Sequence, residues 1–175
     1  MIAIIAEKPS VGMDIARVVG ADTRNDGYCS GNGYMVTWAL GHLVSLATPD
    51  TYGYTKTAAE DLPMLPDPFR LVSRQMRTDR GMVTDIAASK QLKVIESVFN
   101  RCDSIIVATD AGREGELIFR WIYDFLGCTK PFRRLWISSL TDEAIRKGLE
   151  ELKDGSEYDS LYAAADSRAK ADWLG

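Results

Sequence analysis

The sequence has 175 residues, 46 % of them hydrophobic, and a formal net charge of −4, which argues against a domain that grips nucleic acid through bulk positive charge. No apolar run approaches the roughly 20 residues of a membrane-spanning helix, so we expect no membrane association. The three cysteines, Cys29, Cys102 and Cys128, are odd in number and form no Cys-x-x-Cys pair, so neither a disulfide framework nor a zinc ribbon is indicated, and we expect a reducing cytoplasm.

The first predicted element is a buried strand at residues 2–6, which read Ile-Ala-Ile-Ile-Ala. No basic region precedes this strand and Glu7 and Lys8 follow it, so it is not a signal peptide. Ser10 is the predicted N-cap of a helix that ends at Gly20. Glu7 therefore lies where a strand enters a helix, as an ordinary loop acid or as part of a site.

A hairpin is predicted over residues 27–40, with Asn32 and Gly33 at its turn and alternating large and small side chains after it. His42 follows and is the only histidine of the chain. A single histidine builds neither a metal site nor a catalytic triad. It is therefore either a structural side chain or a contact to phosphate.

The periodicity fails from about residue 48 to residue 84, where four prolines mark a long irregular connection. Four arginines fall within eleven residues of this connection: Arg70, Arg74, Arg77 and Arg80. They form either a solvated face or a local strip that binds anions. An amphipathic helix is predicted after it, at residues 86–99.

The most informative stretch is an acidic turn between a strand at residues 105–108 and a helix that runs to about Phe125. The turn carries three carboxylates and a glycine at alternate positions: Asp110, Gly112, Glu114 and Glu116. The carboxyl edge of an open α/β sheet is where ligands bind. If the strands at 2–6 and 105–108 pair in parallel, Glu7 joins these acids.

Clustered carboxylates favour a bound cation. Two of them about 5 Å apart repel by roughly 3 kcal/mol at an effective dielectric constant of 20. Oxygen ligands without a neighbouring cysteine or histidine indicate Mg²⁺, with Mn²⁺ as the alternative. The simpler interpretation is that Glu114 and Glu116 only stabilise the N-terminus of a helix.

The last part of the chain completes an α/β pattern. Residues 135–137 are predicted as a strand, Thr141 as the cap of a helix ending at Gly155, and Ser156 with Asp159 as the capping box of a final helix. The fold class is α/β: a Rossmann-like, mainly parallel sheet flanked by helices, with a hairpin insertion. We assign residues 1–155 to this domain and residues 156–175 to the truncated start of a following helical domain.

Four segments together resemble a known module, and they follow its order. They are residues 6–10 (Ala-Glu-Lys-Pro-Ser), 41–43 (Gly-His-Leu), 108–116 (Ala-Thr-Asp-Ala-Gly-Arg-Glu-Gly-Glu) and 136–141 (Trp-Ile-Ser-Ser-Leu-Thr). The chain resembles the Toprim domain in the amino-terminal part of type IA DNA topoisomerases, nearest to bacterial topoisomerase III. The last four residues resemble the entry to that family's next domain.

The resemblance implies a mechanism. In the family, a tyrosine on a later domain attacks single-stranded DNA, and this nucleophile is expected beyond residue 175. Glu7 matches a general acid–base, and Lys8 and Arg113 match groups that assist at the phosphate. Asp110 and Glu114 match magnesium ligands, with Glu7 and Glu116 as further candidate ligands.

Gly112 departs from the family pattern, which has a second aspartate there, so one potential ligand is missing. The number of metal ions is therefore open. The competing interpretations are a fragment of a Toprim nuclease or primase, which shares the acids, and a non-catalytic interaction domain, which predicts no effect of divalent metal.

Overall fold

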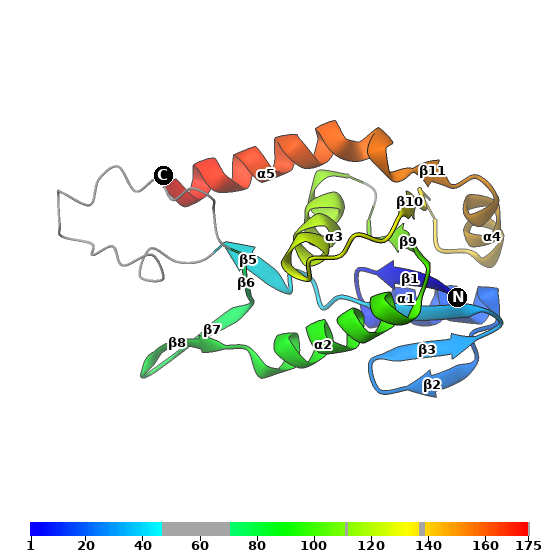
Figure 1. Ribbon diagram of the computed structural model, residues 1–175, viewed down its shortest axis with the longest axis horizontal. Coiled ribbons are helices and arrows are strands. Elements are labelled where there is room, and N and C mark those ends of the chain that lie inside the picture. The colour runs from blue at the N-terminus through cyan, green and yellow to red at the C-terminus, as the bar shows by residue number, and fades with distance from the viewer. Residues whose placement is uncertain (47–70, 111, 137–138, 175) are drawn as a thin grey trace.

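The computed structural model in Figure 1 describes residues 1–46, 71–110, 112–136 and 139–174. Within these residues, seven strands form one sheet in the order β11-β10-β9-β1-β4-β3-β2. In chain order these strands are β1 (Ile2–Ala6), β2 (Thr23–Asn25), β3 (Tyr28–Gly31), β4 (Tyr34–Trp38), β9 (Ser104–Ala108), β10 (Phe132–Arg134) and β11 (Lys153–Asp154). The strands from β10 to β4 pair in parallel, and the outer strands are antiparallel. The predicted α/β class with a mainly parallel central sheet is thus confirmed.

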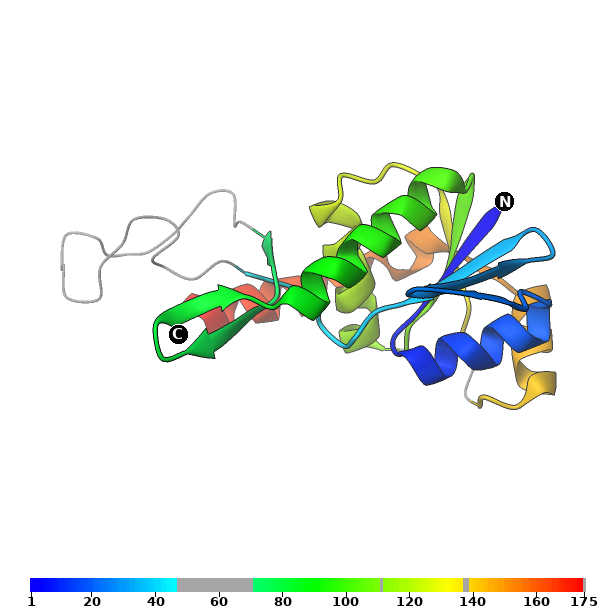
Figure 2. The same ribbon diagram turned by 90° about the horizontal axis from the view of Figure 1, so that it is seen from below.

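Helices cover both faces of the sheet (Figures 1 and 2). They are α1 (Pro9–Val19), α2 (Ile86–Arg101), α3 (Arg113–Phe125), α4 (Asp142–Glu150) and α5 (Asp159–Leu174). Side chains of a strand alternate between its two faces. Accordingly, Ile5 and Val107 pack with α2, α3 and α5, whereas Ile4 and Ile106 pack with α1 and α4. Among the described residues, no helix is long and apolar enough to cross a membrane.

The helix after β1 begins two residues earlier than predicted. Its first residue is Pro9 and its N-cap is Lys8, which makes no capping hydrogen bond through its side chain. The prediction of Ser10 as the N-cap is wrong, because proline has its φ fixed near the helical value and suits the first helical position. The predicted end at Gly20 is confirmed, with φ 83°.

The predicted hairpin is formed by β3 and β4. Asn32 and Gly33 form its turn with φ of 53° and 81°, the pair of positive values that a two-residue turn of this kind requires. The flanking strand β2 was not predicted. It pairs with β3 and extends the sheet beyond the parallel core.

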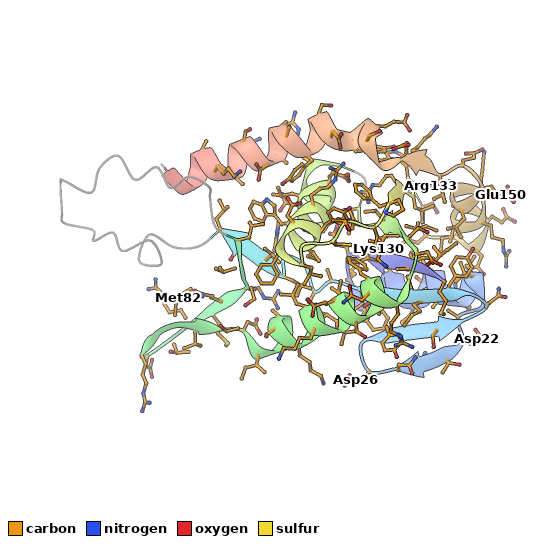
Figure 3. All side chains as sticks on the ribbon, in the orientation of Figure 1. Asp22, Asp26, Met82, Lys130, Arg133 and Glu150 are labelled. Carbon is orange, nitrogen blue, oxygen red and sulfur yellow. The ribbon has the colours of Figure 1, made fainter. Side chains whose placement is uncertain are left out.

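The irregular connection predicted at 48–84 is wrong for residues 71–84. Its residues 48–70 lie outside the described ranges, but β6 (Leu71–Ser73) pairs with β5 (Val44–Leu46). A hairpin of β7 (Gln75–Thr78) and β8 (Gly81–Thr84) follows. It projects from the body in Figures 1 and 2, and Figure 3 labels Met82 on it. The short turn through Asp79 and Arg80 brings the two strands together. The prediction of an irregular connection relied on the prolines and did not consider this turn.

Three predicted features near the end of the chain differ from the structure. The strand expected at 135–137 is β10, three residues earlier, although the Leu135 amide still donates to the Val107 carbonyl at 2.9 Å. Thr141 caps α4 as predicted, but this helix ends at Glu150 and not at Gly155. The predicted capping box of Ser156 and Asp159 is wrong, because the capping box joins Asp154 and Glu157 at the 3₁₀ helix η3 (Gly155–Tyr158), which precedes α5.

Helix α5 packs along α3. Ala165 of α5 is buried in the core. Trp121 on α3 donates a hydrogen bond from its indole nitrogen to the carboxylate of Asp166 on α5 at 2.9 Å. The assignment of residues 156–175 to a following domain stays a prediction.

Candidate metal and catalytic site

Glu7 and Asp110 meet at the carboxyl edge of the sheet. Ala6 and Ala108 are partners in the parallel pairing of β1 and β9, so the residues after them leave the sheet side by side. The Glu7 carboxylate accepts a hydrogen bond from the Asp110 amide at 3.0 Å. The predicted juxtaposition of the two acidic strand ends is confirmed, whereas the roles of the acids stay predictions.

The electrostatics of Glu7 fit a clustered acid. Burial raises the pKa of the Glu7 carboxyl above its ordinary value, and the negative charge of Asp110 raises this pKa further. The hydrogen bond from the Asp110 amide opposes this shift because it favours the charged form. Carboxylates with pKa values shifted by burial and by a specific charged neighbour are concentrated at functional sites.

The lone histidine belongs to this edge. The Gly41 amide donates to the Glu7 carbonyl at 3.3 Å, which brings the turn after β4 beside the acidic turn. His42 contacts the Glu114 carboxylate through Nε2, and its ring lies 5.9 Å from the Trp121 ring. The sequence suggested a structural role or a contact to phosphate for His42. It did not suggest the contact with Glu114, because the two residues are 72 positions apart.

The remaining groups expected at the edge are exposed. The Glu114 side chain is 72 % exposed in the first turn of α3, and Arg113 beside it and Lys8 on the neighbouring turn are also exposed. A cleft of about 480 Å³ opens next to them between β5, α3 and α5. His42, Arg113, Glu114, Trp121, Arg168 and Asp172 are among its lining residues. Of the expected site residues, Arg113 and Glu114 therefore line this cleft, whereas Glu7, Lys8 and Asp110 do not.

Glu116 has different surroundings from those expected of a metal ligand. Its side chain is 1 % exposed, and its carboxylate lies 3.3 Å from Arg120 Nε and 3.6 Å from Arg134 Nε. Residues 115–119 of α3 turn inward against the sheet, and Glu116 is carried with them. We therefore do not retain Glu116 among the proposed ligands.

Arg134, which is 1 % exposed, lies beneath this edge and was not among the predicted site residues. Its guanidinium donates to the Thr109 hydroxyl at 2.8 Å and to the Asp110 carbonyl at 2.6 Å. A usable signal was present: alternation along β10 must turn either Arg133 or Arg134 inward, and an inward arginine needs buried oxygen partners.

Among the described arginines of the predicted anion-binding strip, Arg74 makes contacts that Arg77 and Arg80 do not share. Arg74 donates to the carbonyls of Leu40 and His42 at 2.7 and 3.3 Å and pairs with Asp85 at 3.0 Å. Arg77 and Arg80 are exposed on the projecting hairpin, and Arg70 lies outside the described residues. Arg74 thus holds the turn that carries His42.

Within the described residues, no group of three or more histidine, cysteine or acidic side chains is arranged to hold a metal ion. Glu7 and Asp110 nevertheless supply two carboxylates at one edge. Mg²⁺ keeps several waters and is commonly bound by one or two carboxylates together with substrate phosphates. The donor set therefore fits a hydrated Mg²⁺ and not a closed cage.

A parallel sheet whose adjacent strands β1 and β9 are both followed by acids is typical of α/β domains, in which ligands commonly bind at the carboxyl edge of the sheet. The family described as the Toprim domain matches residues 2–140, and the chain belongs to this family. It is 50 % identical to DNA topoisomerase 3 of Shouchella clausii and 46 % identical to that of Bacillus subtilis strain 168. The alignments cover 98 % of the chain but only 22 % and 23 % of these relatives.

The fold also resembles a solved structure. The full-length topoisomerase I from Thermotoga maritima matches with a TM-score of 0.52 at 18 % identity, over 87 % of this chain and 21 % of that protein. At this identity the likeness supports the fold alone. The chain spans between a fifth and a quarter of the length of these relatives.

Proposed function

We propose that the chain is the Toprim domain of a type IA DNA topoisomerase, acting in the cytoplasm on single-stranded DNA. The observation that carries this proposal is the meeting of Glu7 and Asp110 at the carboxyl edge of the sheet. The similarity to proteins named DNA topoisomerase 3 supports the choice of reaction. The tyrosine nucleophile and the remaining domains would belong to the longer protein.

In this proposal Glu7 and Asp110 hold Mg²⁺, with Mn²⁺ as the alternative, and Glu114, oriented by its contact with His42, is a further ligand. The ion, when bound, would offset negative charge at the scissile phosphate and orient its oxygens. Glu7 would exchange a proton with the 3′ oxygen as general acid and base. Lys8 and Arg113, exposed at the same edge, would contact the phosphate as cations.

The competing enzyme is a Toprim nuclease or primase, which would use the same acids. The length of the similarity to DNA topoisomerase 3, across 98 % of the chain, favours the topoisomerase. A non-catalytic interaction domain is the other alternative. It predicts that Mg²⁺ changes neither the chain nor its affinity for DNA.

The decisive experiment uses the longer protein and measures relaxation of a supercoiled plasmid. Glu7→Gln should suppress cleavage and religation while the protein remains folded, and Glu96→Gln, on the exposed face of α2, serves as the control. Unchanged relaxation by Glu7→Gln would contradict the proposal. The 175-residue chain alone should not relax the plasmid, and nicking by it would instead favour the nuclease.

A further inference from the structure

A buried ion pair lies beneath the acidic turn. Glu116 and Arg134 are both 1 % exposed, and Arg134 Nε lies 3.6 Å from Glu116 Oε2. These two atoms have no hydrogen-bond partner within the described residues. A buried pair with incomplete hydrogen bonding is poorly explained as a device for stability, because desolvation of both charges opposes folding. This makes a role in arranging the chain the better explanation.

The contacts of Arg134 show what is arranged. Its two terminal nitrogens bind the Thr109 hydroxyl and the Asp110 carbonyl. The Thr109 hydroxyl in turn donates to the Gly115 carbonyl at 2.8 Å. Arg134 therefore holds the end of β9 through Thr109 and Asp110, and Thr109 in turn links it to the first turn of α3 through Gly115.

The backbone of Gly115 lies very close to the backbone of Asp110. A Cβ at position 115 would overlap the Asp110 carbonyl oxygen, so the start of α3 lies directly against the residue that Arg134 holds. Glu116 is in the same helical turn, and Arg120 fixes its other oxygen while donating to the Gly155 carbonyl at 2.9 Å.

We infer that Glu116 and Arg134 form a positioning pair that fixes the main chain of the acidic turn and so sets how well Asp110 and Glu114 bind a divalent cation. Arg134 acts through its fork of two parallel donors, and Glu116 acts by orienting that fork. Neither side chain touches the cation. The inference rests on the proposed metal site, and it assigns Glu116 to the support of that site.

The test is a double-mutant cycle on the 175-residue chain. Magnesium affinity is measured by calorimetry for wild type, Glu116→Gln, Arg134→Gln and the double variant, with a thermal melt of each to establish folding. Supporting groups around metal ligands typically change affinity by 10- to 100-fold. We expect about 10-fold weaker binding for each single variant and no further loss in the double variant, because coupled residues are not additive.

Two further variants separate geometry from charge. Arg134→Lys keeps the positive charge but lacks the planar fork, so it should bind Mg²⁺ as weakly as Arg134→Gln. Arg133→Gln is the matched control, since Arg133 is the exposed neighbour on β10, and it should leave the affinity unchanged. Wild-type affinity for Mg²⁺ in Arg134→Lys would overturn the inference. A double variant that binds Mg²⁺ about 100-fold more weakly than wild type would also overturn it, because additive losses would mean that Glu116 and Arg134 act independently.

A measurement without metal keeps the test decisive if a single variant does not fold. In the double variant, which buries no unpaired charge, amide hydrogen exchange at residues 109–116 should be faster than in wild type, with no change at β1. Unchanged exchange in a folded double variant would overturn the inference. If wild type binds no Mg²⁺ at all, the proposed metal site fails, whereas the exchange data still decide whether the pair positions the turn.

Discussion

The carboxylate of Glu7 accepts a hydrogen bond from the amide of Asp110 across 103 positions of sequence. The contact exists because β1 and β9 are parallel neighbours in register, which delivers the residue after each strand to the same edge. A strand-to-helix turn follows both residues, so each acid also lies near the N-terminus of a helix. Such a position favours negative charge and leaves the carboxylates accessible to a ligand.

Asp110→Asn should weaken Mg²⁺ binding to the chain by about 10-fold or more, because it removes one unit of charge next to a divalent ion. We expect wild type to have a dissociation constant of about 1 mM, at the weak end of oxygen-ligand sites. Calorimetry or amide chemical shifts during a magnesium titration would measure it. Asp103→Asn is the matched control, because Asp103 precedes the same strand and is 93 % exposed. Equal affinities of Asp110→Asn and wild type would rule out Asp110 as a ligand.

His42→Ala should reduce magnesium affinity by about 10-fold, the lower end of the effect of groups that orient metal ligands. The reason is the contact between His42 Nε2 and the Glu114 carboxylate, which fixes an otherwise exposed side chain. The same titration measures it. His42→Gln, which retains a side-chain donor, should recover part of the loss. Tighter binding by His42→Ala would instead show that His42 competes with the cation for Glu114.

Asp85 should make the stability of the chain depend on acid pH. Hydrogen bonds from the Ala88 amide and the neighbouring Arg74 guanidinium lower the pKa of Asp85 below its ordinary value of 3.8. The stabilisation is therefore complete above the unfolded-state pKa and is lost as the pH falls through the lower folded-state pKa. Asp85→Asn should melt at a lower temperature than wild type at pH 7.

The difference in melting temperature should shrink as the pH falls from about 5 to about 2, across the ordinary pKa of an aspartate. Asp79→Asn, at the exposed tip of the hairpin, is the control and should follow wild type throughout. A constant difference between Asp85→Asn and wild type would mean that the charge of Asp85 contributes nothing. The result bears on the site because Arg74 also holds the carbonyl of His42.

The sheet and its acidic edge were predictable because each depends on local signals. Residues 2–6 and 105–108 are continuous apolar runs, and such runs followed by polar turns are typical of buried parallel strands. Once two such strands are paired in parallel, the position of Glu7 beside Asp110 follows from topology alone. Asn32 and Gly33 likewise fix their hairpin turn through backbone preferences.

The supporting residues were not predictable from local signals. Whether Glu116 faces solvent or the core depends on how α3 rotates against the sheet, and its neighbours Leu117, Ile118 and Phe119 are all buried. Arg134 finds its partners only after β10 pairs with β9. The contact between His42 and Glu114 joins the turn after β4 to the first turn of α3, 72 positions away, so its existence depends on the assembled sheet.

Gly112 stands where the family has a second aspartate, and its backbone conformation determines how much an aspartate there would destabilise the chain. Its φ of 136° and ψ of −177° belong to a region that is almost exclusive to glycine. Gly112→Asp and Gly112→Ala should therefore both lower the free energy of unfolding by about 1–3 kcal/mol. Urea denaturation of the two variants and wild type would measure this loss.

The pair of variants also isolates the missing carboxylate, since the strain is common to both. A Cβ at position 112 would meet no atom of the described residues within 4 Å, so among these residues a side chain there has open space beside Asp110. If that space faces the cation, Gly112→Asp should bind Mg²⁺ more tightly than Gly112→Ala, because one added charge strengthens a site of two carboxylates. Equal affinities in the two folded variants would mean that position 112 points away from the ion. The glycine would then serve the turn alone, and the ligand set would be complete without a second aspartate.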